Sequence, residues 1–117
     1  MMTLPLFIYG SLRDPRVRAQ LFGTRAGGLS TCPATLPGHQ RQTVPSFDYP
    51  FIAPSDVDDA QVGGELLLGL TDDDYRTLDR YEDLDDGLYV RATVTVQTAA
   101  GPVDAWAYLR GPNAPSE

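Results

Sequence analysis

Glutamate is scarce in this chain, and one glutamate has the surroundings of a general acid–base group. Of the sixteen acidic residues only three are Glu: Glu65, Glu82 and Glu117. Glu82 follows a predicted helix, whose C-terminal end carries the negative end of the helix dipole, and four aspartates lie within four residues of it. Nearby negative charge raises the pKa of a carboxyl group, which suits proton transfer near neutral pH. The alternative is that Glu82 belongs to a solvated acidic cap.

A second candidate site is the loop Tyr9-Gly10-Ser11-Leu12, named the glycine loop below, between a predicted strand and a predicted helix. Glycine at such a turn lets the backbone approach a ligand closely, and amides that precede a helix point toward negative charge. The loop is therefore suited to bind a carboxylate or a developing oxyanion. Turns of this kind are most often structural, so the loop alone does not establish a site.

One cysteine and one histidine exclude several other chemistries. Cys32 cannot form an intrachain disulfide, and one Cys with one His cannot supply the clustered ligands of a zinc site. A nucleophilic pair of Cys32 and His39 is formally possible, but both lie in a Pro- and Gly-rich segment without a flanking signature. The alternatives are a buried, apolar Cys32 and an exposed His39. We predict neither a metal nor a cofactor.

The charge distribution argues against nucleic acid as a partner. The net charge is −7, every basic residue is Arg, and the balance is +4 over residues 1–47 and −11 over residues 48–86. Such a chain repels phosphate backbones. No apolar run approaches the roughly 20 residues of a membrane-spanning helix, and residues 1–5 lack the basic start of a secretory signal. We expect a soluble, cytoplasmic protein that binds neither nucleic acid nor membrane.

The elements of the first half place the glycine loop between a strand and a helix. Residues 3–9 form an apolar run that predicts a buried strand. Asp14 suits the N-cap of the following helix, Pro15 its first turn and Gly23 its end. Residues 24–54 are rich in Gly, Pro, Ser and Thr, which predicts short irregular strands and loops and excludes a regular helix.

The elements of the second half place Glu82 at a helix end. Residues 61–70 predict a core strand whose glycines permit a bulge or a close backbone approach. Thr71 caps a helix with three Asp in its first turn, which runs to about Tyr81. Residues 89–96 alternate as in a half-buried strand, and residues 103–109 predict a last strand.

Together these elements predict one α+β domain over residues 1–117 with its core at about 6–109. The chain has 117 residues, and 42% of them are apolar, which is enough apolar side chains to build one hydrophobic core. Five to seven strands and two short helices favour a mixed or antiparallel sheet that curls into a small barrel flanked by the helices. Residues 111–117 are expected to fray.

Four short motifs occur in a specific order along the chain. The glycine loop follows the first strand, Val62-Gly63-Gly64-Glu65-Leu66 lies mid-chain, and Leu78-Asp79-Arg80-Tyr81-Glu82 is followed seven residues later by Tyr89-Val90-Arg91. This combination resembles the gamma-glutamylcyclotransferase-like family, which includes the plant AIG2-like proteins, over residues 6 to about 109. The chain lacks the long C-terminal extension of the animal glutathione-pathway enzymes, so it looks closer to the AIG2-like or gamma-glutamylamine branch.

The resemblance implies a small mixed β-barrel and an enzyme without a cofactor. Such an enzyme cyclises the γ-glutamyl group of a small γ-glutamyl amine or amino acid to 5-oxoproline and releases the amine. The resemblance assigns the glutamyl head group to the glycine loop and acid–base catalysis to Glu82. Family members commonly have Gly directly after that Glu, where this chain has Asp83. A non-catalytic binding or interaction module of the same fold is therefore the alternative.

Other residues could complete the pocket. Tyr89 and Tyr108 are candidates to line it, although aromatic strand residues equally suit the core. Arg13 or Arg91 could clamp a carboxylate, but structural ion pairs are the more common role for such residues. The leaving group would contact the Pro-rich residues 33–54 and the Asp-rich turn, and a γ-glutamyl conjugate of another kind would fit the same sequence pattern.

Overall fold

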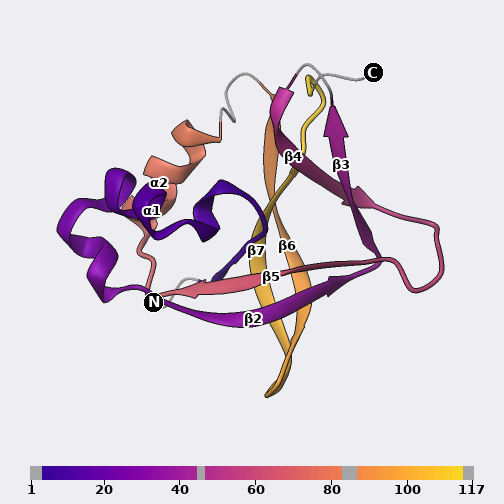
Figure 1. The fold of residues 1–117 in the computed structure, drawn as a ribbon, viewed down its shortest axis with the longest axis horizontal. Coiled ribbons are helices and arrows are strands. Elements are labelled where there is room, and N and C mark those ends of the chain that lie inside the picture. The colour runs from indigo at the N-terminus through magenta and orange to yellow at the C-terminus, as the bar shows by residue number, and fades with distance from the viewer. Residues whose placement is uncertain (1–3, 45–46, 83–86, 115–117) are drawn as a thin grey trace.

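Seven strands form two sheets in the computed structural model, which describes residues 4–44, 47–82 and 87–114 (Figure 1). The strands are β1 (Leu6–Ile8), β2 (Ser30–Pro37), β3 (His39–Val44), β4 (Phe47–Pro54), β5 (Gln61–Leu68), β6 (Tyr89–Thr98) and β7 (Gly101–Arg110). Five of them close a barrel in the order β1-β5-β2-β6-β7, and β3 pairs with β4. The barrel is mixed because β1 runs antiparallel to β5 and parallel to β7. The predicted fold class is therefore confirmed.

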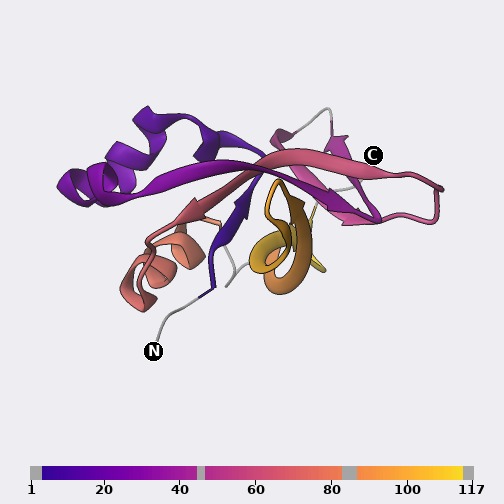
Figure 2. The same cartoon turned by 90° about the horizontal axis from the view of Figure 1, so that it is seen from below.

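The helices lie together on one side of the molecule, with the β3–β4 sheet on the other (Figures 1 and 2). They are the 3₁₀ helices η1 (Ser11–Arg13) and η2 (Gly23–Gly28) and the α-helices α1 (Pro15–Phe22) and α2 (Asp72–Tyr81). The Asp14 side chain accepts a hydrogen bond from Arg16 N, and α1 ends at Gly23, whose φ of 58° favours glycine. The predicted start and end of α1 are confirmed.

The predicted irregularity of residues 24–54 is wrong for the strands that follow η2. Strand β2 pairs with β5 along its whole length, although it contains Pro33 and Pro37. Its opposite edge pairs with β6 at a single position, Thr35 with Gln97. Because most of that edge forms no ladder, β2 can contain residues that lack an N–H donor.

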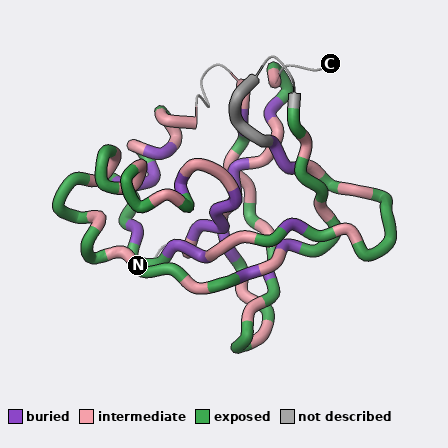
Figure 3. The backbone as a smooth tube through the Cα atoms, in the orientation of Figure 1, coloured by how far each residue is buried: buried purple, intermediate pink, exposed green. Residues whose placement is uncertain are grey.

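Side chains pack into two buried clusters, one within the barrel and one toward the helices. The barrel cluster comprises Phe7, Tyr9, Ala34, Leu36, Ile52, Val62, Leu66, Val96, Ala105 and Ala107. The helix-side cluster comprises Leu6, Ile8, Leu12, Phe51, Leu67, Leu70, Tyr75, Leu78, Tyr89 and Tyr108. Alternating side chains of β1 and β7 divide between the two clusters, as the period of a strand requires. Figure 3 shows the buried backbone gathered at the centre, whereas α1 has no buried residue and the β4–β5 loop is largely exposed.

The end of the chain that was expected to fray begins with hydrogen-bonded residues. Gly111 N donates to Leu88 O at 2.9 Å, and Asn113 N donates to Gly87 O at 2.9 Å. Residues 115–117 lie outside the described part of the chain. Among the described residues, none of the helices is long and apolar enough to cross a membrane.

The start of α2 is held by a buried carboxylate, Asp74. Its Oδ2 accepts a hydrogen bond from Thr71 N at 2.8 Å, and Thr71 Oγ1 accepts one from Asp74 N, which completes a capping box. The same carboxylate accepts two hydrogen bonds from the Arg25 guanidinium of η2. Burial raises the pKa of Asp74, but the hydrogen bonds from Arg25 and Thr71 outweigh burial and hold that pKa below its ordinary value.

Replacing Asp74 by Asn is expected to lower the free energy of unfolding by about 1 to 2 kcal/mol at pH 7, because the charge-assisted pair with Arg25 is lost while the amide oxygen can still accept from Thr71 N. A lowered folded-state pKa stabilises the protein above the unfolded pKa of about 3.9, and this contribution disappears as pH falls through the folded pKa. Urea unfolding should therefore show a smaller difference between variant and wild type at pH 3 than at pH 7. The exposed Asp73 in the same turn provides the control, since Asp73→Asn should cost less than about 0.5 kcal/mol. Equal stability of Asp74→Asn and wild type at pH 7 would contradict this assignment.

Candidate functional site

The glycine loop leaves the barrel at the end of β1 and enters η1. Two guanidinium groups hold its ends: Arg41 donates to the Tyr9 carbonyl oxygen, and Arg18 donates to the Leu12 carbonyl oxygen at 2.7 Å. The Leu12 side chain is buried in the helix-side cluster. Within the described residues, the backbone N–H groups of Ser11 and Leu12 donate to no acceptor. The loop therefore offers backbone donors on a conformation that side chains fix.

A hydrogen bond connects the glycine loop to the end of α2. Ser11 Oγ lies 2.8 Å from Tyr81 Oη, although the two residues are 70 positions apart in the chain. Tyr81 is the last residue of α2, and Glu82 follows as its C-cap, with its N–H donating to Leu78 O at 2.8 Å. The structure thus brings together the two candidate sites of the sequence, the glycine loop and Glu82.

Two buried tyrosines lie beside Glu82. Tyr9 Oη donates to the Tyr108 carbonyl oxygen at 2.6 Å, and Tyr108 Oη donates to Asp79 Oδ1 at 2.7 Å. Burial raises the pKa of Tyr9, and the neighbouring Tyr89 and Glu82 raise it further. Burial, the hydrogen bond to Asp79 and the charge of Glu82 likewise raise the pKa of Tyr108. Both phenols are therefore neutral at pH 7 and are committed to protein acceptors.

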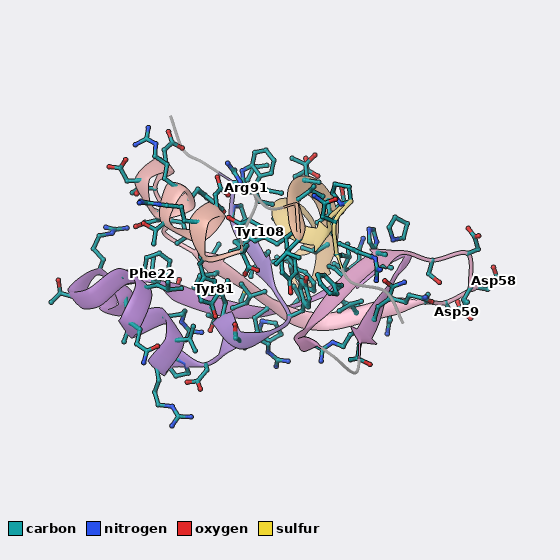
Figure 4. The ribbon with its side chains drawn as sticks, turned by 90° about the horizontal axis from the view of Figure 1, so that it is seen from above. Phe22, Asp58, Asp59, Tyr81, Arg91 and Tyr108 are labelled. Carbon is teal, nitrogen blue, oxygen red and sulfur yellow. The ribbon has the colours of Figure 1, made fainter. Side chains whose placement is uncertain are left out.

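An ion pair supports this arrangement from α2. The Arg91 guanidinium donates to both Asp79 oxygens, at 3.0 and 3.3 Å, and lies over the rings of Tyr75 and Trp106 at 4.9 and 4.5 Å. Figure 4 shows Arg91 and Tyr108 between the helices and strand β7. Because Asp79 lies three residues before Glu82 on α2, this ion pair also orients the helix end that carries Glu82. The Arg91 guanidinium binds a carboxylate of the protein itself, so the structural ion pair expected for Arg91 is confirmed.

The other candidate residues from the sequence lie in an ion pair, in the core and at the start of η1. Arg13 pairs with Glu65 at 3.1 Å, so it too forms a structural ion pair. Tyr89 is buried, with its ring centroid 4.8 Å from that of Phe51, and contributes to the core while acting electrostatically on Tyr9. Gly10 is half-buried at the start of η1.

The predicted acidic surroundings of Glu82 differ in part from those in the structure. Asp79 is compensated by Arg91 and Tyr108, so its charge is not free to act as the sequence pattern suggested. Asp83, Asp85 and Asp86 lie outside the described residues.

Sequence reasoning missed the structural roles of Asp79, Tyr81 and Arg41. The first two lie in the same short motif as Glu82, and the spacing of three between Asp79 and Glu82 places both on one helix face. That spacing was the available signal. For Arg41 there was none, because its contact with Tyr9 depends on how the β3–β4 sheet packs against the barrel.

Cys32 and His39 make none of the contacts described above. Cys32 is a free, half-buried residue packed against the barrel cluster, and His39 Nδ1 lies 3.0 Å from the Pro37 carbonyl oxygen. In the part of the chain that the structure describes, no three or more His, Cys, Asp or Glu side chains are grouped to hold a metal ion. Figure 4 also shows Asp58 and Asp59 at a distant loop tip, away from Tyr81 and Tyr108.

Comparison with known proteins identifies similar sequences and folds. A sequence model of the family described as "Gamma-glutamyl cyclotransferase, AIG2-like" matches residues 6–117. AIG2-like protein C of Arabidopsis thaliana is 37% identical over 91 residues, which cover 78% of this chain and 48% of that protein. AIG2-like protein D of the same plant is 36% identical over 91 residues, and the match covers 55% of that protein. The chain spans about half the length of the curated relatives it matches.

Solved structures share the fold over nearly the whole chain. The solution structure of an Arabidopsis thaliana protein matches with a TM-score of 0.79 at 28% identity, covering 97% of this chain and 65% of that one. A gamma-glutamyl cyclotransferase structure matches with a TM-score of 0.73, covering 92% of this chain and 66% of that one. Its sequence identity is 20%, so this second likeness concerns the fold alone.

Proposed function

Because the chain belongs to the AIG2-like gamma-glutamyl cyclotransferase family, we propose that it is an enzyme that cyclises the γ-glutamyl group of a small γ-glutamyl amine or amino acid. The products are 5-oxoproline and the free amine. The observation that carries this proposal is the hydrogen bond between Ser11 and Tyr81, because it joins the glycine loop to the residue next to Glu82. This contact supports a site in which backbone donors and a carboxylate act on one substrate, which is what the reaction requires.

The reaction needs neither a nucleophilic side chain nor a second substrate. A γ-glutamyl compound contains both the attacking α-amino group and the γ-carbonyl carbon, so binding it in a folded conformation supplies much of the advantage of proximity. The α-amino group has a reference pKa of about 8 and is mostly protonated near pH 7. Removing that proton and stabilising the oxyanion are the tasks left to the protein.

Each task has a candidate group. The Glu82 carboxylate takes a proton from the α-amino group, whose nitrogen then bonds to the γ-carbonyl carbon. The tetrahedral oxyanion accepts hydrogen bonds from the N–H groups of Ser11 and Leu12. Glu82 returns this proton to the leaving nitrogen as its bond to the carbon breaks. The ring nitrogen then gives up its second excess proton through Glu82, so that 5-oxoproline and a protonated amine leave. Tyr9 and Tyr108 form the rigid wall beside Glu82, since their hydroxyl groups already donate to the protein.

The purified protein is expected to form 5-oxoproline from at least one member of a panel of γ-glutamyl amino acids and γ-glutamyl amines. Product is measured by chromatography, and thermal unfolding with and without each compound reports binding, since a ligand of the native state raises its stability. Thermal stabilisation without product would instead identify a non-catalytic binding module. A complete lack of both product and stabilisation would refute a γ-glutamyl site.

A further inference from the structure

Most arginines of the described residues are neutralised by carboxylates, but the one that contacts the start of the glycine loop is not. Ion pairs join five arginines to acidic side chains: Arg13, Arg16, Arg25, Arg76 and Arg91. Arg41 is exposed, and its only hydrogen bond within the described residues is to the Tyr9 carbonyl oxygen. In the described part of the chain, this positive charge at the candidate site therefore has no acidic partner.

Within the described residues, most N–H donors of the Arg41 guanidinium make no hydrogen bond. Arginine presents five N–H donors in a planar fork, and one nitrogen of Arg41 is occupied by Tyr9. The fork matches the two oxygens of a carboxylate, and such charge-assisted pairs are about twice as strong as neutral hydrogen bonds. A ligand that brings a carboxylate to this position would complete the bonding of Arg41 and balance its charge.

The β3–β4 sheet determines where Arg41 lies relative to the site. Arg41 is paired in register with Ile52, which is fully buried in the barrel cluster beside Tyr9. The sheet is therefore anchored to the wall of the site by β4, while β3 carries the cation on an exposed position. Arg41 also acts electrostatically on the Tyr9 phenol, which places its charge near the group that Glu82 influences.

We propose that Arg41 determines specificity by binding a carboxylate on the leaving group, so that γ-glutamyl amino acids are preferred over γ-glutamyl amines. The inference rests on the proposed function and names the substrate class. The glycine loop supplies backbone donors for the glutamyl head, whereas Arg41 extends from a separate sheet and is free to contact the part of the substrate that departs. In a γ-glutamyl amino acid, the leaving-group carboxylate is attached to the carbon next to the scissile nitrogen.

The test compares two substrates that differ by one carboxylate, γ-glutamylalanine and γ-glutamylethylamide. Wild type is expected to have the higher kcat/KM for γ-glutamylalanine. Arg41→Gln should lower kcat/KM for γ-glutamylalanine about 10- to 100-fold, mainly through KM, and change that for γ-glutamylethylamide less than about threefold. Arg18→Gln, which loses the other guanidinium contact to the loop, is the matched control and should affect both substrates equally.

Equal losses with both substrates in Arg41→Gln would show that Arg41 acts on the loop or on the glutamyl head that both substrates share, and would overturn the inference while leaving the proposed function intact. Calorimetric binding of both compounds to Glu82→Gln, with and without Arg41→Gln, separates the two claims. If wild type forms no 5-oxoproline, the proposed function fails, and the binding comparison alone decides the role of Arg41. A loss of affinity confined to γ-glutamylalanine supports that role, and equal affinities with and without Arg41 refute it.

Discussion

Replacement of Glu82 by Gln is expected to reduce kcat for 5-oxoproline formation by about 10²- to 10⁴-fold, the range that positioned acid–base groups contribute. The amide has nearly the shape of the carboxylate but cannot take the proton of the α-amino group. Because Gln keeps the size and shape of the side chain, the free energy of unfolding should change by less than about 1 kcal/mol. Steady-state product formation and urea unfolding measure the two quantities.

The controls for Glu82 separate proton transfer from folding and binding. Asp72→Asn makes the same chemical change at the other, exposed end of α2 and should leave kcat unchanged. Glu82→Asp retains a carboxylate on a shorter side chain and should have intermediate activity. Glu82→Gln should still be stabilised thermally by substrate. A Glu82→Gln variant with wild-type kcat would exclude this residue as the acid–base group.

A methyl group at position 64 is expected to destabilise the protein by about 3 kcal/mol, the upper end of the cost of overpacking a core. A Cβ at Gly64 would lie 2.3 Å from the Ile8 carbonyl oxygen and 2.9 Å from the Phe7 ring. The first contact involves backbone, so β1 and β5 would have to separate for Gly64→Ala to fold. Urea unfolding at constant m-value measures the loss.

The neighbouring glycine provides the control. A Cβ at Gly63 would meet no atom within 4 Å, so Gly63→Ala should change stability by less than about 1 kcal/mol. Because Ile8 directly precedes the glycine loop, Gly64→Ala should also lower kcat/KM in the fraction that folds. Equal stability of the two alanine variants would contradict the close approach of β1 to β5 at this position.

The sequence predicted those elements whose signals are local. Asp14 followed by Pro15 specifies the start of α1, and Thr71 with the aspartates after it specifies the start of α2, because capping involves residues within one turn. Alternation in β7 correctly separated Trp106 and Tyr108 from Ala105, Ala107 and Leu109. These patterns, together with the order of the motifs, were sufficient to predict a small mixed barrel with helices on its flank.

The regular strands within residues 24–54 could not be predicted in the same way. Prolines at positions 33 and 37 argue against a strand in isolation. They are accommodated because β5 pairs with one edge of β2 and β6 leaves most of the other edge unpaired. Which edge is open depends on barrel order, and barrel order is a property of the whole chain.

The same distinction between local signals and long-range contacts applies to the candidate site. Motifs read along the chain identified the glycine loop and Glu82 as separate candidates and assigned both to one family. Barrel closure brings residues together across 70 and 99 positions, so that Ser11 contacts Tyr81 and Tyr9 contacts Tyr108. Pairing of Arg91 with Asp79, and the absence of such a partner for Arg41 within the described residues, likewise follow from three-dimensional packing. Local sequence specifies a cap or an alternating face because the interacting groups are neighbours in the chain, whereas the partners of charged and phenolic groups depend on strand register and helix docking.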